Sequence, residues 1–238
     1  MKQAKFAVFD IDGTLIRWQL FHAIVHELGK QGYMDETSHQ KIRNARMKWK
    51  NRGNPDSFKE YETVLLGEYM VALQTIPPEQ YHRAVEKVFD VYKDQLFVYT
   101  RSLLRQLKKA GYLLFAISGS QDEIVQKLAA YHGFDAAVGA KLITIEGKYT
   151  GHVESPVHRK DTALRELVST YGASFTGSIA VGDSVSDIAM LELVAQPIAF
   201  NPEAALYAHA KKHGWKIVVE RKNVVYELDH TNKGYVVA

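Results

Sequence analysis

Short apolar runs that alternate with helical patterns constrain the fold of this 238-residue chain more than any other feature of its sequence. The apolar runs are Lys5–Phe9, Tyr112–Ile117, Ser178–Val181, Pro197–Phe200 and Trp215–Val219. Helical patterns follow three of these runs, over Gln121–His132, Asp187–Val194 and Glu203–His213. Short buried strands that alternate with amphipathic helices are typical of a parallel sheet covered on both faces. We therefore predict an α/β fold with a doubly wound, mostly parallel sheet.

A long helical stretch interrupts the strand pattern after the first apolar run. The predicted helices are Gln19–Leu28, His39–Trp49, Ser57–Leu73 and Glu79–Tyr92, with gaps at Gly32, Gly53-Asn54-Pro55 and Pro77-Pro78. Because strands resume afterwards, we interpret residues 17–96 as a helical domain inserted after the first strand. Residues 1–16 and 97–238 then form a discontinuous α/β core. In this core, Lys141–Ile145 and Tyr149–Val153 predict a small hairpin.

The composition narrows the classes of protein to which this chain can belong. Hydrophobic residues make up 46% and charged residues 24%, which is ordinary for a soluble globular protein. The formal net charge of +3 is far below the excess of a dedicated nucleic-acid binder, so a nucleic-acid partner is not expected. The absence of cysteine excludes disulfides, thiolate nucleophiles and thiolate zinc sites. No apolar run approaches the roughly 20 residues of a membrane span, so we expect a cytoplasmic protein without a membrane partner.

Two carboxylates stand where the first predicted strand ends, in Asp10-Ile11-Asp12-Gly13-Thr14. Open α/β folds bind ligands at the carboxyl edge of the sheet, which is where this segment is expected. Two carboxylates in different environments can divide the work, one attacking as a nucleophile and the other carrying a proton. Gly13 permits a tight turn, and the Thr14 hydroxyl can fix an acid. An ordinary strand-to-turn junction rich in Asp and Gly is the alternative interpretation.

Two further segments favour anion binding. Ser118-Gly119-Ser120 follows an apolar strand and opens a helix, so a hydroxyl and exposed N–H groups could hold an anion. An ordinary helix N-cap by one of these serines explains the same pattern. Lys160 begins another helical pattern, and Arg159 beside it is an equal candidate. Because a lone lysine is usually a solvated surface residue, its assignment depends on the other segments.

A second pair of acids follows the third apolar run, within Gly182–Asp187. Asp183 and Asp187 are four residues apart and could meet across the first turn of a helix. Together with Asp10 and Asp12 they would make an all-oxygen site suited to a hard cation, most naturally Mg²⁺. The alternative is that the first acid caps the helix and the second interacts with the helix dipole.

Taken in order, these four segments resemble the motifs of the haloacid-dehalogenase-like superfamily of phosphohydrolases. The matching segments are Asp10–Thr14, Ser118, Lys160 and Gly182–Asp187. Within the superfamily, the chain is most similar to the phosphoserine-phosphatase-like branch, which has a helical cap domain inserted after the first motif. Asn201-Pro202 also fits that branch. The resemblance covers roughly the whole chain and implies a Rossmann-like core with a cap at residues 17–96.

The resemblance implies a Mg²⁺-dependent phosphatase that acts through an aspartyl-phosphate. Asp10 would be the nucleophile, and Asp12 would protonate the leaving alcohol and later deprotonate water. Asp10, Asp183 and the backbone carbonyl of Asp12 would hold Mg²⁺. The phosphate-binding groups would be Ser118, Gly119 and Lys160. Thr14 and Asp187 would support these groups, Asp187 by orienting the lysine or metal-bound water.

The departures from the family pattern concern the substrate. Phosphoserine phosphatases of this branch carry an acidic residue near the position of Gln19 and an arginine in the cap. Here Gln19 is neutral, and Asp56–Tyr69 contains no arginine. We therefore expect the substrate to be a small phosphorylated metabolite other than phosphoserine. Trp18 and His22 are further candidate substrate residues, although packing between helices is the better explanation of most aromatic residues in this stretch.

Several other interpretations stay open at this point. The basic run Lys41–Arg52 contains no acid and could steer anionic substrates, but a solvated helix face explains it more simply. A GDS-type serine esterase would use Ser184 with His230 and leave the first acid pair idle. A phospho-accepting signalling domain would be far shorter than this chain. A phosphotransferase of the same superfamily would share the aspartyl-phosphate. We expect a monomer or a homodimer.

Overall fold

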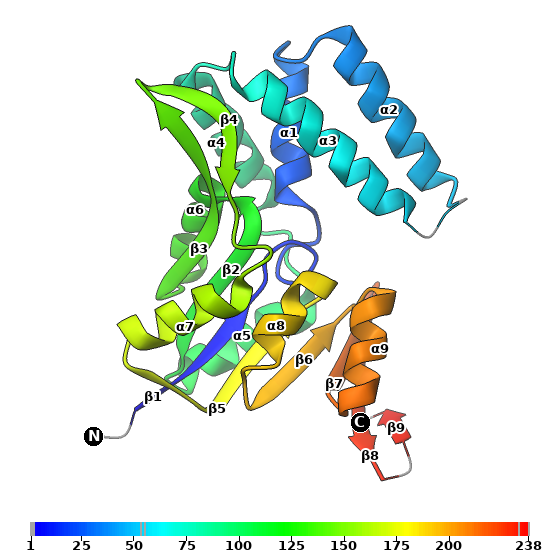
Figure 1. The fold of residues 1–238 in the computed structure, drawn as a ribbon. Helices are drawn as coiled ribbons and strands as arrows, with labels where there is room; N and C mark the ends of the chain where they lie inside the picture. The colour runs from blue at the N-terminus through cyan, green and yellow to red at the C-terminus, as the bar shows by residue number, and fades with distance from the viewer. Residues whose placement is uncertain (1–2, 53, 55, 233, 238) are drawn as a thin grey trace. The chain divides into compact units, whose positions relative to one another are not determined.

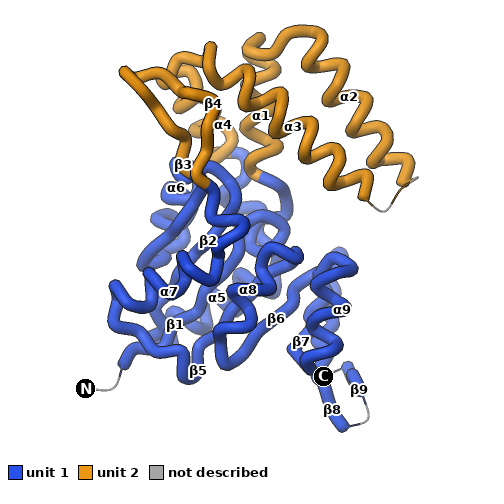
Figure 2. Tube along the Cα trace, in the orientation of Figure 1, with its two compact units in different colours: residues 1–19, 91–140, 155–238 blue, residues 20–90, 141–154 orange. Residues whose placement is uncertain are grey.

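The structure is a computed structural model that describes residues 3–52, 54, 56–232 and 234–237 (Figure 1). Gly53 and Pro55, which belong to a predicted gap between helices, lie outside the described residues. The chain divides into two compact units (Figure 2). The first unit comprises Met1–Gln19, Val91–Ala140 and Ser155–Ala238, and the second comprises Leu20–Asp90 and Lys141–Glu154. Among the described residues, no helix combines the length and the apolar character needed to cross a membrane.

A mostly parallel sheet forms the centre of the first unit (Figure 1). Its parallel strands are β1 (Ala4–Phe9), β2 (Leu113–Gln121), β3 (Ala136–Ile145), β5 (Ala173–Gly182), β6 (Gln196–Phe200) and β7 (Lys216–Arg221). They lie in the order β3-β2-β1-β5-β6-β7. One face carries α5 (Val98–Lys109) and α6 (Asp122–His132), and the other carries α7 (Lys160–Thr170), α8 (Ile188–Leu191) and α9 (Ala204–His213). The predicted doubly wound α/β fold is confirmed.

Burial explains why these apolar runs form strands. Residues 6–9 of β1 are each 0% exposed, because helices cover both faces of the sheet. Parallel pairing places Phe9 beside Ala116 of β2 and beside Val181 of β5. The residues that follow these three positions therefore reach the same edge of the sheet.

The C-terminal part of the first unit differs from the expectation. Two antiparallel strands, β8 (Val224–Thr231) and β9 (Gly234–Val237), extend the sheet beyond β7 and have no counterpart among the predicted elements. Most of their residues are exposed or half-buried, so the segment lacks a continuous apolar run. The helix predicted over Asp187–Val194 is only a 3₁₀ turn (Val185–Asp187) followed by the short α8. It ends early because Leu193 and Val194 form tight turns that lead into β6.

The described residues of the second unit form four helices and a hairpin. The helices are α1 (Leu20–Lys30), α2 (Glu36–Lys50), α3 (Ser57–Leu73) and α4 (Pro78–Tyr92), and the hairpin joins β3 to β4 (Lys148–Glu154). All four predicted helices are confirmed, with ends that shift by a few residues. In α1, Leu20, Ile24 and Leu28 recur at helical spacing and are fully buried. The apolar face of this helix is therefore buried within the unit, as its periodicity predicts.

The hairpin groups with the helices, whereas the predicted core of residues 97–238 included it. β4 contacts α3, and Tyr149 of β4 meets the ring of Tyr81 of α4 edge-on at 5.2 Å between centroids. Pairing with β2 ends at Ala140 of β3, and pairing with β4 begins at Lys141. The compact units therefore differ from the predicted domains at this hairpin, because its side chains pack on the helices.

Candidate active site

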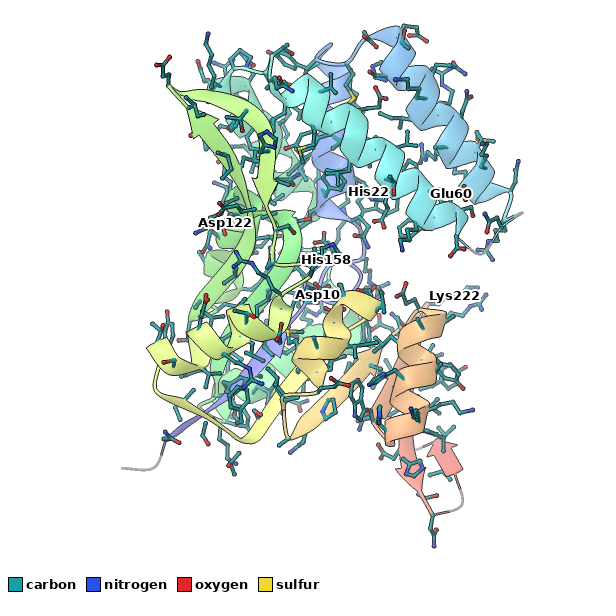
Figure 3. All side chains as sticks on the ribbon, in the orientation of Figure 1. Asp10, His22, Glu60, Asp122, His158 and Lys222 are labelled. Atoms are coloured by element: carbon teal, nitrogen blue, oxygen red, sulfur yellow. The ribbon has the colours of Figure 1, made fainter. Side chains whose placement is uncertain are left out.

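The polar segments found in the sequence meet at the carboxyl edge of the parallel sheet in the first unit, where Figure 3 marks Asp10. Asp10 directly follows β1, Ser118 lies in the last part of β2, and Asp183 directly follows β5. Because β1 lies between β2 and β5, these three positions are neighbours in space although they are distant in the sequence.

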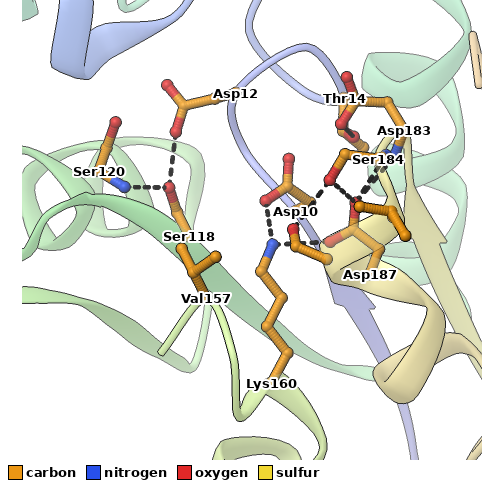
Figure 4. A network of polar contacts seen from close by, with 12 residues as sticks. Asp10, Asp12, Thr14, Ser118, Ser120, Val157, Lys160, Asp183, Ser184 and Asp187 are labelled. Carbon is orange, nitrogen blue, oxygen red and sulfur yellow. Dashed lines mark hydrogen bonds and ion pairs between the residues drawn. The ribbon is translucent and has the colours of Figure 1, made fainter. Parts of the chain in front are cut away.

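Lys160, the first residue of α7, is the centre of an ion-pair network (Figure 4). Its Nζ lies 2.6 Å from Asp10 Oδ1 and 2.6 Å from Asp187 Oδ1. The exposed fractions of the three side chains are 2% for the lysine, 6% for Asp10 and 0% for Asp187. Arg159, an equal candidate from the sequence, is exposed. The structure thus distinguishes the two neighbouring cations and buries only the lysine among the acids.

Asp187 braces the loop that carries Asp183. Asp187 Oδ2 accepts hydrogen bonds from the N–H groups of Asp183 and Ser184, at 3.1 and 3.0 Å, and from the Ser184 hydroxyl at 3.1 Å. Its other oxygen binds Lys160, so both oxygens of Asp187 are occupied. Gly182 permits this packing, since a Cβ there would lie 2.5 Å from Asp187 Cβ. Asp183 is therefore the acid of this loop that is better placed to bind a cation.

The first motif orients Asp183. The Thr14 hydroxyl donates a hydrogen bond to Asp183 Oδ1 at 3.3 Å. Gly13 has a φ of 81°, a left-handed conformation that favours glycine. A Cβ on Gly13 would also lie 2.2 Å from Asp183 Oδ2, so no other residue fits at this position without displacing the carboxylate.

Asp12 is hydrogen-bonded to Ser118. The Ser118 hydroxyl donates to Asp12 Oδ2 at 2.6 Å and accepts from the Ser120 N–H at 2.9 Å (Figure 4). Gly119 packs tightly on Val157, because a Cβ on this glycine would lie 2.5 Å from Val157 Cγ2. The structure therefore brings the predicted proton carrier and the predicted phosphate-binding serine into direct contact.

Burial and neighbouring charges shift the pKa values of Asp10, Asp183 and Lys160. Burial, opposed by Lys160 and reinforced by the charge of Asp187, raises the pKa of Asp10 from 3.8 to about 7. Burial and the charge of Asp10 raise the pKa of Asp183 well above its ordinary value. Burial lowers the pKa of Lys160, but the charges of Asp10 and Asp187 outweigh it and the net shift is upward. The lysine is therefore a permanent cation beside acids whose ionisation is costly.

This donor set fits a hard divalent cation. Carboxylate oxygens of Asp10, Asp183 and Asp187 all lie within 4.8 Å of one another, the one such group of acids or histidines among the described residues. A bound cation would offset the burial and the mutual repulsion that raise the pKa values of Asp10 and Asp183. Carboxylate oxygens are the ligands that hard divalent cations take in proteins. Because Lys160 and the loop amides occupy Asp187, Asp10 and Asp183 are the better candidate ligands.

The candidate substrate residues are Trp18, Gln19 and His22. Trp18 is 37% exposed and Gln19 is half-buried. His22 belongs to the second unit, where it is buried and its Nε2 lies 3.2 Å from Glu62 Oε1. The rings packed around it are Phe21, Phe58 and Tyr61. These contacts are those of a packed helix residue.

One supporting residue has no counterpart among the sequence predictions. Glu203 lies at the N-cap position of α9, and its Oε1 accepts a hydrogen bond from the Val185 N–H at 2.6 Å. Its own N–H donates to the Asp183 carbonyl at 2.9 Å. The nearest signal in the sequence is the preceding Asn201-Pro202, because Glu203 by itself looks like any surface acid.

Comparison with known families identifies the class of protein. The family described as haloacid dehalogenase-like hydrolase matches residues 7–192, which is most of the chain. The chain therefore belongs to the haloacid dehalogenase-like hydrolase family. The resemblance inferred from the four motifs is confirmed, including its phosphoserine-phosphatase-like branch.

Several of the similar proteins are named as phosphatases. The chain is 27% identical over 202 residues to the phosphoserine phosphatase of Methanocaldococcus jannaschii, which covers 84% of this chain and 86% of that protein. It is 27% identical over 225 residues to the histidinol-phosphatase of Neisseria meningitidis, covering 89% and 97%. A structure of the phospho-aspartyl intermediate analogue of phosphoserine phosphatase matches with a TM-score of 0.61 and 25% identity, over 93% of this chain and 96% of that one. The predicted assignment to the phosphatases of this family is confirmed.

Replacing Asp10 with asparagine is expected to stabilise the metal-free protein above pH 7. A carboxyl whose pKa is raised by folding holds its proton more tightly in the folded state, so stability falls as the pH rises through that pKa. For Asp10 the loss begins above its ordinary value of 3.8 and is complete above about 7. Thermal denaturation in EDTA at about pH 8 should give a Tm roughly 5 °C higher for Asp10→Asn than for the wild type.

The matched control is Glu166→Gln, which removes an exposed charge from α7 and should leave the Tm close to that of the wild type. A Tm for Asp10→Asn below that of the wild type at this pH would contradict the picture of a strained carboxylate cluster.

Proposed function

We propose that this protein is a Mg²⁺-dependent phosphomonoester hydrolase that works through an aspartyl-phosphate at Asp10. The observation that carries the proposal is the buried ammonium of Lys160, which lies 2.6 Å from both Asp10 and Asp187. Burial of a charge is costly, whereas a lysine on an ordinary surface helix keeps its charge in water. The burial of Lys160 among acids therefore favours a functional role for this lysine. The phospho-aspartyl intermediate analogue of a similar phosphatase supports the same chemistry.

In the first step, a carboxylate oxygen of Asp10 attacks the phosphorus, and the bond from phosphorus to the leaving oxygen breaks. Asp12 gives a proton to that oxygen, so the product leaves as a neutral alcohol. Before substrate binds, the Ser118 hydroxyl donates to Asp12 Oδ2 at 2.6 Å and holds this acid at the site. The phosphoryl group is then bonded to Asp10.

In the second step, Asp12 takes a proton from a water molecule as the water oxygen attacks the phosphorus. The bond between phosphorus and Asp10 breaks, which restores the carboxylate and releases inorganic phosphate. Two in-line displacements suit a carboxylate nucleophile, because each step forms and breaks one bond to phosphorus. Asp12 returns to its protonated form and is ready for the next substrate.

Charge is the main obstacle in both steps, since a carboxylate must approach a phosphate that bears about two negative charges. Lys160 lies beside Asp10 and stabilises the charge that spreads over the equatorial oxygens. Once substrate is bound, the Ser118 hydroxyl turns its one proton from Asp12 to these oxygens, and the Gly119 amide donates a second hydrogen bond to them. Asp10, Asp183 and the backbone carbonyl of Asp12 would hold Mg²⁺, which would supply further positive charge at the phosphate.

Two alternatives have less support. For a serine esterase, Ser184 needs a histidine, but its hydroxyl contacts Ser186 at 2.8 Å and Asp187 at 3.1 Å, and no described histidine bonds to it. His230 instead packs against Tyr235, with ring centroids 5.3 Å apart. A phosphotransferase would use the same residues, and we favour hydrolysis because the family is one of hydrolases.

We also propose that residues 17–96 act as the cap domain that selects the substrate.

The first test is a phosphatase assay with a generic aryl phosphate. Asp10→Asn should lower kcat by at least about 10³-fold because the nucleophile is lost, while Glu166→Gln keeps wild-type turnover. Wild-type activity should disappear in EDTA and return when Mg²⁺ is added. Wild-type turnover by Asp10→Asn would disprove the nucleophile, and full activity after dialysis against EDTA would disprove the metal requirement.

We further propose that the preferred substrate is a small organophosphate other than phosphoserine. The neutral Gln19 offers no charge-assisted contact to an ammonium group, and Asp56–Tyr69 offers no arginine for a carboxylate. A screen of phosphorylated metabolites, with histidinol phosphate and phosphoserine included, should give phosphoserine a kcat/KM at least about tenfold below that of the best substrate. A clear preference for phosphoserine would overturn this proposal without affecting the reaction chemistry.

A further inference from the structure

We propose that Glu203 is a positioning residue that holds the metal-binding carboxylate of Asp183 in place from the connection between β6 and α9. This inference rests on the proposed function, because it concerns the affinity for the divalent cation which that function requires. Glu203 touches none of the reacting groups and acts only through the loop of residues 183–185.

Glu203 makes two hydrogen bonds to this loop. Its side-chain Oε1 accepts a hydrogen bond from the Val185 N–H at 2.6 Å. Its backbone N–H donates to the carbonyl oxygen of Asp183 at 2.9 Å. The first bond is short and has a charged acceptor, and both of its residues are exposed to solvent. One residue from a neighbouring strand connection therefore fixes both ends of the loop.

The loop is held from the opposite direction by Asp187, whose Oδ2 accepts from the N–H groups of Asp183 and Ser184. In contrast, the carboxylate of Asp183 has a single side-chain hydrogen bond among the described residues, a long one of 3.3 Å from Thr14. Its position therefore depends on the backbone that carries it. Glu203 and Asp187 together determine where that backbone lies.

The position of Glu203 is itself fixed by Asn201. Asn201 has a φ of 43°, in the left-handed region that asparagine tolerates better than most residues. Its N–H donates to the Val218 carbonyl at 2.8 Å, and its Oδ1 accepts from the Glu220 N–H at 2.8 Å. The turn after β6 is thus tied to β7 and delivers Glu203 to the loop.

Loss of the Glu203 carboxylate leaves the Val185 N–H without its partner and frees one end of the loop. Removal of a residue that orients a metal ligand typically weakens metal binding by 10–100-fold. The Asp183 carboxylate itself is retained, so saturating Mg²⁺ should restore most of the catalytic rate. A metal affinity that changes while the saturated kcat does not is the signature of positioning.

The test is calorimetric titration of the purified full-length protein with Mg²⁺ in the absence of substrate. Glu203→Ala should raise the Mg²⁺ dissociation constant about tenfold. Glu203→Gln keeps an oxygen acceptor for the Val185 N–H and should stay within about threefold of the wild type. At saturating Mg²⁺ both variants should keep kcat within about threefold. Glu166→Ala, an exposed change on α7, serves as the control with wild-type affinity.

The outcomes separate this inference from the proposed function. A wild-type protein that binds no Mg²⁺ would overturn both. Wild-type binding together with unchanged affinity in Glu203→Ala would overturn the positioning role and leave the proposed function intact. A lower Tm of Glu203→Ala in EDTA with an unchanged dissociation constant would assign Glu203 to helix stability alone and would also overturn the positioning role.

Discussion

At the carboxyl edge of the sheet, three carboxylates lie close together with only one ammonium beside them. The rest of the site depends on this excess of negative charge. If Asp10, Asp183, Asp187 and Lys160 are all ionised, two negative charges are left over. Poorly compensated charge is costly away from water, which explains why the pKa values of Asp10 and Asp183 are raised. A divalent cation would balance this charge.

Sheet topology makes this crowding possible. The central β1 lies between β2 and β5, and all three run parallel, so segments that are far apart in the sequence end at one edge. Lys160 arrives from the start of α7, on the face that also carries α8 and α9. Gly13 and Gly182 then let backbone approach carboxylates more closely than any side chain permits. The fold brings the acids close together, and the two glycines leave space for their carboxylates.

Local patterns predict most of the fold. The five apolar runs predict β1, β2, β5, β6 and β7, and the hairpin pattern predicts the second half of β3 but not the first half, which pairs in parallel with β2. Helical periodicity predicts all four helices of the second unit. The strands β8 and β9 escape prediction because their residues are mostly half-buried or exposed, and their pairing is decided by contacts with β7. The segment Asp187–Val194 reads as one helix because its apolar spacing is helical, but turns at Leu193 and Val194 end it early.

The sequence predicts which residues form the candidate site, but it does not predict the contacts between them. The order of motifs indicates Asp10, Asp183 and Lys160, whereas only coordinates separate Lys160 from Arg159 by burial. The bond from Ser118 to Asp12 and the clamp by Glu203 join positions 106 and 18 or more residues apart. No local pattern encodes such pairings, because they arise when the strands are brought side by side.

Chemical trapping tests the central claim most directly. Protein is mixed with an aryl phosphate, quenched in acid and treated with borohydride, which reduces an aspartyl-phosphate to homoserine, and the peptides are analysed by mass spectrometry. We predict homoserine at position 10 when Mg²⁺ is present and an unmodified Asp10 in EDTA. Phosphate on Ser184, or rapid turnover with no modification at position 10, would contradict the account.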